Sequence, residues 1–351
     1  MKNATRSVLL PSFLLLVVCA GMTNSAVANA SEEDDVSQNS TPPDLPPQAA
    51  HLHAQRFAEN PIIRPEMLPN GDGKNINGPT LIRVPDWIAE PLGKYYLYFA
   101  DHGGAYIRLA YADVLAGPWK IHTPGSLRLE QAPDGRRHIA SPDVLVDAER
   151  NELRMYFHCP SKSTGEQMTY VARSTDGIRF VAGATPLGPS YFRVFRYEGY
   201  WYAMAKPGTL YRSLDGLTPF EVGPNAFAGV KGCNEGNTRI RHVALDLVEN
   251  VLNVYWTNIG DRPESILHAS IALNADWTEW KASPPELLLK PQEPYEGADL
   301  PLLASQGAKS TARENAVRDP GIFKEEGRTY LLYSVAGEAG IAIAELIAGK
   351  P

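Results

Sequence analysis

An internal repeat constrains the fold more than any other feature of this chain. Five segments share one pattern: a short apolar strand, a polar turn, a strand rich in aromatic residues, and a third strand of alternating apolar and polar residues. The copies begin at Gly78, Ser141, Tyr191, Arg241 and Arg318. Alternation with a period of two places successive side chains on opposite faces, which indicates β-strands and not helices. We therefore expect one antiparallel sheet per copy.

The number of strands in each copy predicts how the sheets are arranged. Copies one to four end with a fourth segment that carries a large aromatic residue: Trp119, Phe180, Phe220, or Trp277 with Trp280. Repeated four-stranded sheets are typical of the blades of a β-propeller. The fifth copy stops near Leu346, so we expect the N-terminal stretch 60–64 to supply its outer strand and close the ring, which removes open sheet edges. The prediction is an all-β, five-bladed propeller.

The N-terminal residues before the repeats predict an exported protein. Lys2 and Arg6 precede the apolar run 9–20, and the small residues at 28–30 favour cleavage after Ala30, an order typical of a secretory signal peptide. A lipid anchor on Cys19 is the alternative. Residues 31–50 are polar, acidic and rich in proline, which indicates a disordered linker. We expect residues 51–351 to form the single propeller domain of a secreted or periplasmic protein.

Composition excludes several classes of partner. The net charge is −7 and no basic cluster is present, which argues against nucleic acid as a ligand. No segment after the leader is apolar enough to predict a membrane span. No spacing of His or Cys matches a dedicated metal motif and no phosphate-binding loop is present, so neither a metal nor another cofactor is expected. Cys159 and Cys233 follow the leader, and the sequence leaves open whether they pair.

Two short motifs occupy corresponding points of two repeats: Ser141-Pro142-Asp143 in the second and Arg318-Asp319-Pro320 in the fifth. In these motifs, and in its blade pattern from 78 to 346, the chain resembles the five-bladed propeller glycoside hydrolases, the superfamily of arabinanases, β-xylosidases and invertases. The resemblance implies a funnel on the propeller axis where three carboxyl groups act as base or nucleophile, acid and pKa tuner. The chain departs from that pattern at Asn77, where an aspartate would be expected, and in the third repeat, which begins without an acidic residue.

Candidate site residues follow from position at the strand starts. The predicted catalytic residues are Asp319 and Asp143, in acid, base or tuning roles, with His242 or Glu235 as a possible proton donor. The predicted substrate-binding residues are the other polar side chains near the strand starts: Asn77, Asp101, His102, His138, Arg193, Arg241 and Arg318. An aspartate beside proline can instead cap a turn. The three arginines suit an acidic sugar such as a uronate, or alternatively form salt bridges with Asp143 and Asp319.

These observations give one main functional hypothesis and two alternatives. The main one is a secreted glycoside hydrolase that acts on a poly- or oligosaccharide through carboxylates in the funnel. The first alternative, favoured by Asn77, is a propeller that binds carbohydrate without cleaving it. The second is an interaction scaffold whose axis is plugged by ion pairs.

Overall fold

The computed structural model describes residues 52–231 and 239–349, which lie within one compact unit, 46–351. The expected signal peptide and linker, together with Glu235 and Cys233, lie outside the described residues. Within the described ranges the helices are short 3-10 turns: η1 (Pro65–Met67), η2 (Pro69–Lys74), η3 (Leu129–Gln131), η4 (Trp277–Glu279) and η5 (Pro294–Glu296). None of the described helices has the length and apolar character needed to cross a bilayer.

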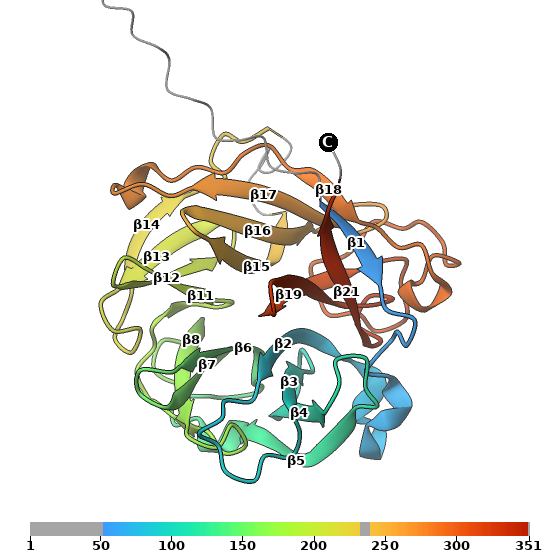
Figure 1. The fold of residues 1–351 in the computed structure, drawn as a ribbon, viewed down its shortest axis with the longest axis horizontal. Coiled ribbons are helices and arrows are strands. Elements are labelled where there is room, and N and C mark those ends of the chain that lie inside the picture. The colour runs from blue at the N-terminus through green and yellow to red at the C-terminus, as the bar shows by residue number, and fades with distance from the viewer. Residues whose placement is uncertain (1–51, 232–238, 350–351) are drawn as a thin grey trace, which may run out of the picture. The chain divides into compact units, whose positions relative to one another are not determined.

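Five antiparallel sheets surround a common axis, which confirms the five-bladed propeller (Figure 1). Blade one comprises β2 (Asn77–Arg83), β3 (Tyr95–Ala100), β4 (Tyr106–Ala112) and β5 (Lys120–Arg128). Blade two comprises β6 (Ala140–Asp147), β7 (Glu152–Pro160) and β8 (Gln167–Ser174), with an outer edge divided between β9 (Val181–Ala182) and β10 (Gly188–Pro189). Blade three comprises β11 (Arg193–Tyr197), β12 (Tyr200–Ala205), β13 (Thr209–Ser213) and β14 (Glu221–Asn225).

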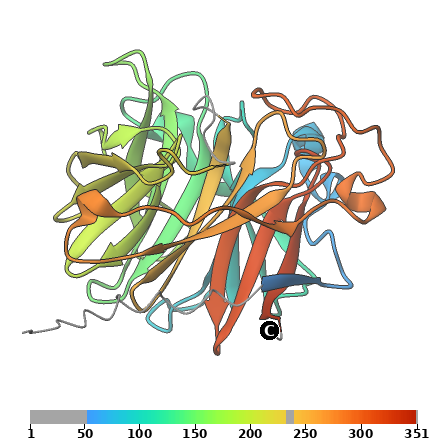
Figure 2. The ribbon, with the colours of Figure 1, turned by 90° about the horizontal axis from the view of Figure 1, so that it is seen from above.

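The last two blades differ in where their outer strands come from. Blade four comprises β15 (Ile240–Val248), β16 (Val251–Asn258), β17 (Ile266–Ala272) and β18 (Glu286–Leu289). Blade five comprises β19 (Arg318–Glu325), β20 (Arg328–Ser334), β21 (Ile341–Ala348) and β1 (Leu52–Arg56). In the side view the strands run between the two ends of the ring (Figure 2). Each innermost strand is paired with a second strand that returns to the end where the innermost strand began.

The ring is closed by the N-terminal part of the chain, but not by the residues that the sequence indicated. Strand β1 pairs antiparallel with β21, whereas the expected strand 60–64 contributes only an isolated bridge between Ile63 and Ile341. Pro61 has no N–H to donate to a ladder. The side chain of Asn60 replaces the backbone here: its Nδ2 donates to the carbonyl of Ile343 and its Oδ1 accepts from the same residue's N–H. The prediction of 60–64 as the closing strand was wrong for this reason.

Repeated contacts join neighbouring blades and explain the aromatic second strands. In blade one the Tyr98 hydroxyl donates to the carbonyl of Gly177, and in blade two the Tyr156 hydroxyl donates to that of Gly216. Both glycines have positive φ, 70° and 67°, which a residue without a side chain adopts readily. A Cβ on Gly216 would lie 2.7 Å from the Tyr156 oxygen. The turn glycine therefore lets the next blade approach closely.

The innermost strands carry a bulge at the end where they begin. Their register shifts within the first residues of β2, β6, β15 and β19. In three of these strands the second residue has positive φ: 61° at Gly78, 51° at Ser141 and 50° at Asp319. Such conformations are uncommon for residues with a Cβ and occur often at functional sites. Bulges change the direction in which side chains point and are common next to active sites. The starts of the innermost strands are therefore the places where we look for a functional site.

Candidate active site

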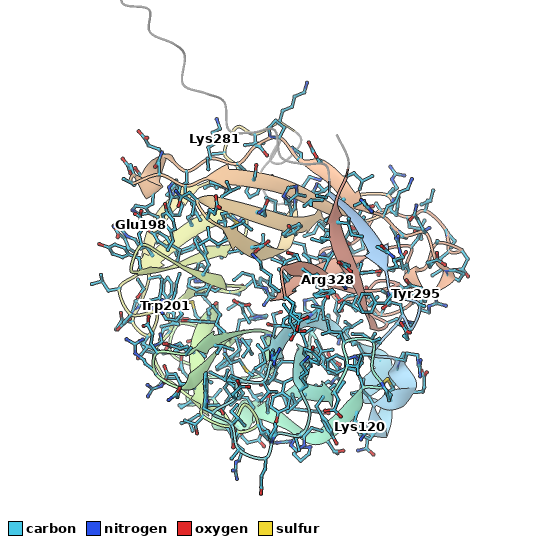
Figure 3. The ribbon with its side chains drawn as sticks, in the orientation of Figure 1. Lys120, Glu198, Trp201, Lys281, Tyr295 and Arg328 are labelled. Atoms are coloured by element: carbon cyan, nitrogen blue, oxygen red, sulfur yellow. The ribbon has the colours of Figure 1, made fainter. Side chains whose placement is uncertain are left out.

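Polar side chains gather at the end of the ring where the innermost strands begin. They come from those strand starts, from the adjoining ends of the second strands, and from the loops that follow. We call this cluster the mouth, defined by Asn75, Asn77, His102, His158, Tyr191, Lys206, Arg241, His242, Glu264, Arg318, Asp319 and Glu338. Large side chains of the outer blade surfaces, such as Glu198 and Lys281, lie at the periphery instead (Figure 3).

His242 and Asp319 form a buried pair across two blades. Nδ1 of His242, on β15, lies 2.5 Å from Oδ1 of Asp319, on β19, and their side chains are 2 % and 0 % exposed. Burial lowers the pKa of His242 to about 4, against the opposing effect of Asp319. Burial acts to raise the pKa of Asp319, but the adjacent His242 and Arg241 outweigh it and hold that pKa well below its usual range. At neutral pH we assign one proton to Nδ1, so Nε2 of His242 carries a free lone pair.

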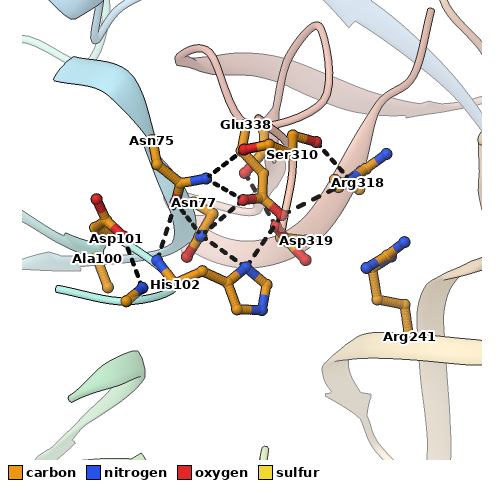
Figure 4. A network of polar contacts seen from close by, with 12 residues as sticks. Asn75, Asn77, Ala100, Asp101, His102, Arg241, Ser310, Arg318, Asp319 and Glu338 are labelled. Carbon is orange, nitrogen blue, oxygen red and sulfur yellow. Dashed lines mark hydrogen bonds and ion pairs between the residues drawn. The ribbon is translucent and has the colours of Figure 1, made fainter. Parts of the chain in front are cut away.

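A second imidazole–carboxylate pair, His102 with Glu338, lies beside Asp319 (Figure 4). Nδ1 of His102 lies 3.1 Å from Oε1 of Glu338, a buried residue in the loop between β20 and β21. Asn75 donates to the other oxygen of this carboxylate, and Asn77 lies 3.4 Å from it. Burial disfavours the charged form of His102, but the hydrogen bond and charge of Glu338 outweigh burial, so the pKa of His102 lies above its ordinary value.

The two imidazoles have related geometry and opposite protonation preferences. The rings of His102 and His242 are stacked with centroids 6.1 Å apart and an interplanar angle of 23°. Each is oriented through Nδ1 by a carboxylate of blade five. His242 favours the neutral form and His102 the protonated form. Neighbouring groups whose pKa values are driven apart are the arrangement that acid–base catalysis needs.

Two arginines of the mouth belong to a buried ion network. Nε of Arg241 donates to Glu264 at 2.7 Å, and Nη2 of Arg318 lies 2.9 Å from the same carboxylate. Arg318 also pairs with Glu314 at 2.6 Å, and Thr257 donates to Glu264. Both guanidinium groups are buried. They hold the starts of β15 and β19 together. Their ion-pair partners are Glu264 and Glu314, whereas the sequence suggested Asp143 or Asp319.

Asp143 and Arg193 lie farther along the axis, below the mouth. Arg193 donates to the carbonyls of Pro142 and Val243, and it lies 3.7 Å from Asp143. Asp143 accepts from the N–H of Val194. Burial raises the pKa of Asp143 in spite of Arg193. The axial cavity that they line has a volume of about 40 Å³, enough for a water molecule and too small for a sugar ring.

Tyr191 separates two histidines of the mouth. Its ring centroid lies 4.3 Å from that of His158 and 4.1 Å from that of His242, and its φ is 70°. Both ring nitrogens of the buried His158 lack hydrogen-bond partners within the described part of the chain. Burial holds the pKa of His158 well below its ordinary value. A tyrosine in a left-handed conformation is a strained residue, and this one covers the reactive face of His242.

The structure thus brings together some of the predicted residues and separates others. The mouth contains six of them: Asn77, His102, Arg241, His242, Arg318 and Asp319. Two occupy the rim. Asp101 accepts from the N–H of Gly103, and His138 lies 3.1 Å from Gln167. The roles of all of these residues remain predictions.

Sequence reasoning missed six members of the mouth: Asn75, His158, Tyr191 as a site residue, Lys206, Glu264 and Glu338. For four of them the strand topology could have indicated a place in the site. Each of those four lies at the end of a second strand or in the loop after it, as His102 does, and antiparallel pairing brings that point beside a strand start. Among the described residues no group of three or more His, Cys, Asp or Glu side chains is arranged to hold a metal ion.

Comparison with solved structures shows which known proteins share this fold. A putative glycosidase from Bacteroides thetaiotaomicron has a TM-score of 0.56 at 12% identity, covering 85% of this chain and 97% of that one. The α-L-arabinofuranosidase of Lactobacillus brevis has a TM-score of 0.54 at 13% identity, covering 82% and 92%. A family-43 β-xylosidase/α-arabinofuranosidase from a compost metagenome, solved with xylotriose, has a TM-score of 0.55 at 13% identity, covering 78% and 91%. The chain therefore has the five-bladed propeller fold of family-43 glycosidases, as the resemblance implied.

The family itself is shown by a relative of similar length. The chain belongs to the same family as the uncharacterized protein R118 of Acanthamoeba polyphaga mimivirus. The two are 38% identical over 325 residues, which covers 85% of this chain and 91% of R118. No family model matches the sequence.

Proposed function

We propose that this protein is a glycoside hydrolase whose acid–base pair is His102 and His242. The observation that carries the proposal is the pair of stacked imidazoles, each in contact through Nδ1 with its own buried carboxylate and with pKa values shifted in opposite directions. The likeness of the fold to glycosidases supports the choice of substrate class, although fold alone does not establish an activity.

The proposed reaction is a single displacement by water. Nε2 of His242 takes a proton from the water as its oxygen bonds to the anomeric carbon. The bond from that carbon to the glycosidic oxygen breaks, and the protonated Nε2 of His102 gives its proton to the leaving oxygen. Asp319 stabilises the imidazolium that forms on His242, as a carboxylate does for a histidine base.

A single displacement by water inverts the configuration at the anomeric carbon. His242 is nearly inaccessible beneath Tyr191. Access of water and substrate to its Nε2 therefore requires the Tyr191 ring to turn aside.

Carbohydrate binding without cleavage is the second candidate, and Asn77 favours it. An amide stands at the blade-one position where the glycosidase pattern places a carboxylate base, and its Nδ2 faces Glu338. The mouth carboxylates Asp319, Glu338 and Glu264 are each engaged with a basic side chain. A site of this kind could hold a sugar through hydrogen bonds alone.

Release of reducing sugar from a panel of neutral and acidic polysaccharides separates the two candidates. We expect turnover by the wild type and a loss of at least ~100-fold in His242→Gln and His102→Gln, the range for removal of a general base or acid. His122→Gln, on the outer strand β5, is the matched control and should retain full activity. Saturable binding of a polysaccharide without turnover would support the binding propeller instead.

We also propose that the protein acts outside the cytoplasm, on the basis of residues 1–30 alone. N-terminal sequencing of protein recovered from an exporting host should begin at Ser31. A chain that retains Met1 would contradict this proposal, whereas lipidation on Cys19 would contradict only cleavage after Ala30.

A further inference from the structure

Among the described residues, the ionisable groups of the mouth that lie around the two imidazoles are in direct contact with one another. Asp319 is paired with His242, Glu338 with His102, Glu264 with Arg241 and Arg318, and Arg318 also with Glu314. These carboxylates and guanidinium groups are therefore already engaged within the protein.

Lys206 is the exception. It follows the inner end of β12, and its Nζ lies 4.8 Å from the centroid of the Tyr191 ring. Within the described residues it has neither an ion pair nor a hydrogen bond through Nζ. Burial and the nearby Arg241 lower the pKa of this ammonium, while Asp319 and Glu264 act on it from beyond ion-pair distance and only partly compensate.

Lys206 is partly buried, and an ammonium that loses part of its hydration is normally paired with an anion. The contact with the Tyr191 ring supplies only a weak cation–π attraction. Among the described residues of the mouth, Lys206 is therefore a cation that no protein anion contacts. The same tyrosine ring contacts His242, so an anion bound by Lys206 would lie beside the imidazole pair.

We propose that Lys206 recognises an anionic group on the sugar, either the carboxylate of a uronic acid or a sulfate ester. Of the arginines that the sequence suggested for this role, Arg241 and Arg318 are engaged with Glu264 and Glu314, and Arg193 donates to backbone carbonyls below the mouth. The inference names a substrate class for the proposed hydrolase. Cleavage of that substrate depends on the proposed function, but binding of the anion does not. Recognition of the anion stands on the charge arrangement alone.

Calorimetric titration of the full chain with matched oligosaccharides tests the inference. One pair is oligogalacturonate and its neutral methyl ester, and the other is a sulfated galactan oligosaccharide and its desulfated form. We expect the wild type to prefer the anionic member of one pair by at least ~10-fold, the scale of one charge-assisted hydrogen bond. The pair that shows the preference identifies the anion.

Variants then assign the preference to Lys206. Lys206→Met should bind both members of the pair equally, with unchanged affinity for the neutral one, whereas Lys281→Met, a peripheral control, should match the wild type. Because Lys206 has no ion-pair partner in the part of the chain that the structure describes, the Tm of Lys206→Met should equal or exceed that of the wild type. A preference that survives in Lys206→Met, the lack of any preference in the wild type, or a Tm several degrees lower would each overturn the inference.

Failure of this inference is distinguishable from failure of the proposed function. Anion-selective binding that depends on Lys206, without cleavage of any sugar, would refute the hydrolase and support the recognition site. Cleavage of neutral glycans without any anionic preference would refute the recognition site and leave the hydrolase standing.

Discussion

Replacement of Asp319 by asparagine isolates the contribution of one negative charge to the mouth. Asparagine nearly matches aspartate in volume and tolerates the left-handed backbone at this position, where φ is 50°. Its amide oxygen can still accept from Nδ1 of His242. The fold should persist, while the imidazolium that forms during turnover loses its charge partner.

The magnitude follows from the contact between the two groups. Opposite charges about 4 Å apart attract by about 4 kcal/mol at an effective dielectric constant of ~20, which corresponds to about a thousandfold in rate. We therefore expect kcat/KM of Asp319→Asn to fall by about 10³, within the range for loss of a general base. The pKa of His242 should fall further below 4 for the same reason.

The assay is release of reducing sugar under single-turnover conditions, with circular dichroism to confirm folding. Asp246→Asn is the matched control, because this buried carboxylate is on β15, the strand of His242, but lies away from the mouth. Its Oδ1 is 2.8 Å from Nζ of Lys324. Its activity per folded molecule should match the wild type. Full activity in folded Asp319→Asn would refute the assignment of His242 as a base oriented by Asp319.

Two further predictions follow. The pH profile of kcat/KM should be bell-shaped: activity falls below about pH 4 as His242 gains a proton, and it falls at alkaline pH as His102, whose pKa lies above the ordinary 6.5, loses one. Glu338→Gln should move the alkaline limb to lower pH. An unmoved limb would exclude His102 as the acid. Arg56→Met should destabilise the ring by about 2–3 kcal/mol, somewhat less than a fully buried pair, because it removes the 2.8 Å ion pair between β1 and the buried Glu296. Urea unfolding measures this as a lower midpoint with an unchanged m-value, and an unchanged midpoint would show that the pair does not stabilise ring closure.

The blades were predictable from the sequence because each repeats a local pattern. Alternation, turn residues and aromatic second strands are properties of short segments, and five copies reinforce one another. The closing strand was harder, since 60–64 and 52–56 both precede blade one and both present a few apolar residues. The choice depended on Asn60, whose side chain occupies ladder positions on β21 in a way that no periodicity reveals.

The mouth was only half predictable. His242 and Asp319 lie at strand starts, where the repeat itself points to the axis. Glu338 and Glu264 lie in loops whose lengths differ from blade to blade, so their convergence depends on tertiary structure. Asp143 showed the opposite difficulty: its motif resembles that of Asp319, yet it lies two residues further along its strand and faces the axial cavity below the mouth.

Closure by the two ends of the chain also determines the order in which the protein can fold. Asn60 and Ile343, which meet beside β1, are 283 positions apart in the sequence. Contacts of such long range slow folding because a large loop must close before they form. Until the last strand is synthesised the ring stays open, with blade edges exposed to other chains. A circular permutant that joins the two ends and begins between two blades would make this pairing a local hairpin and should refold faster.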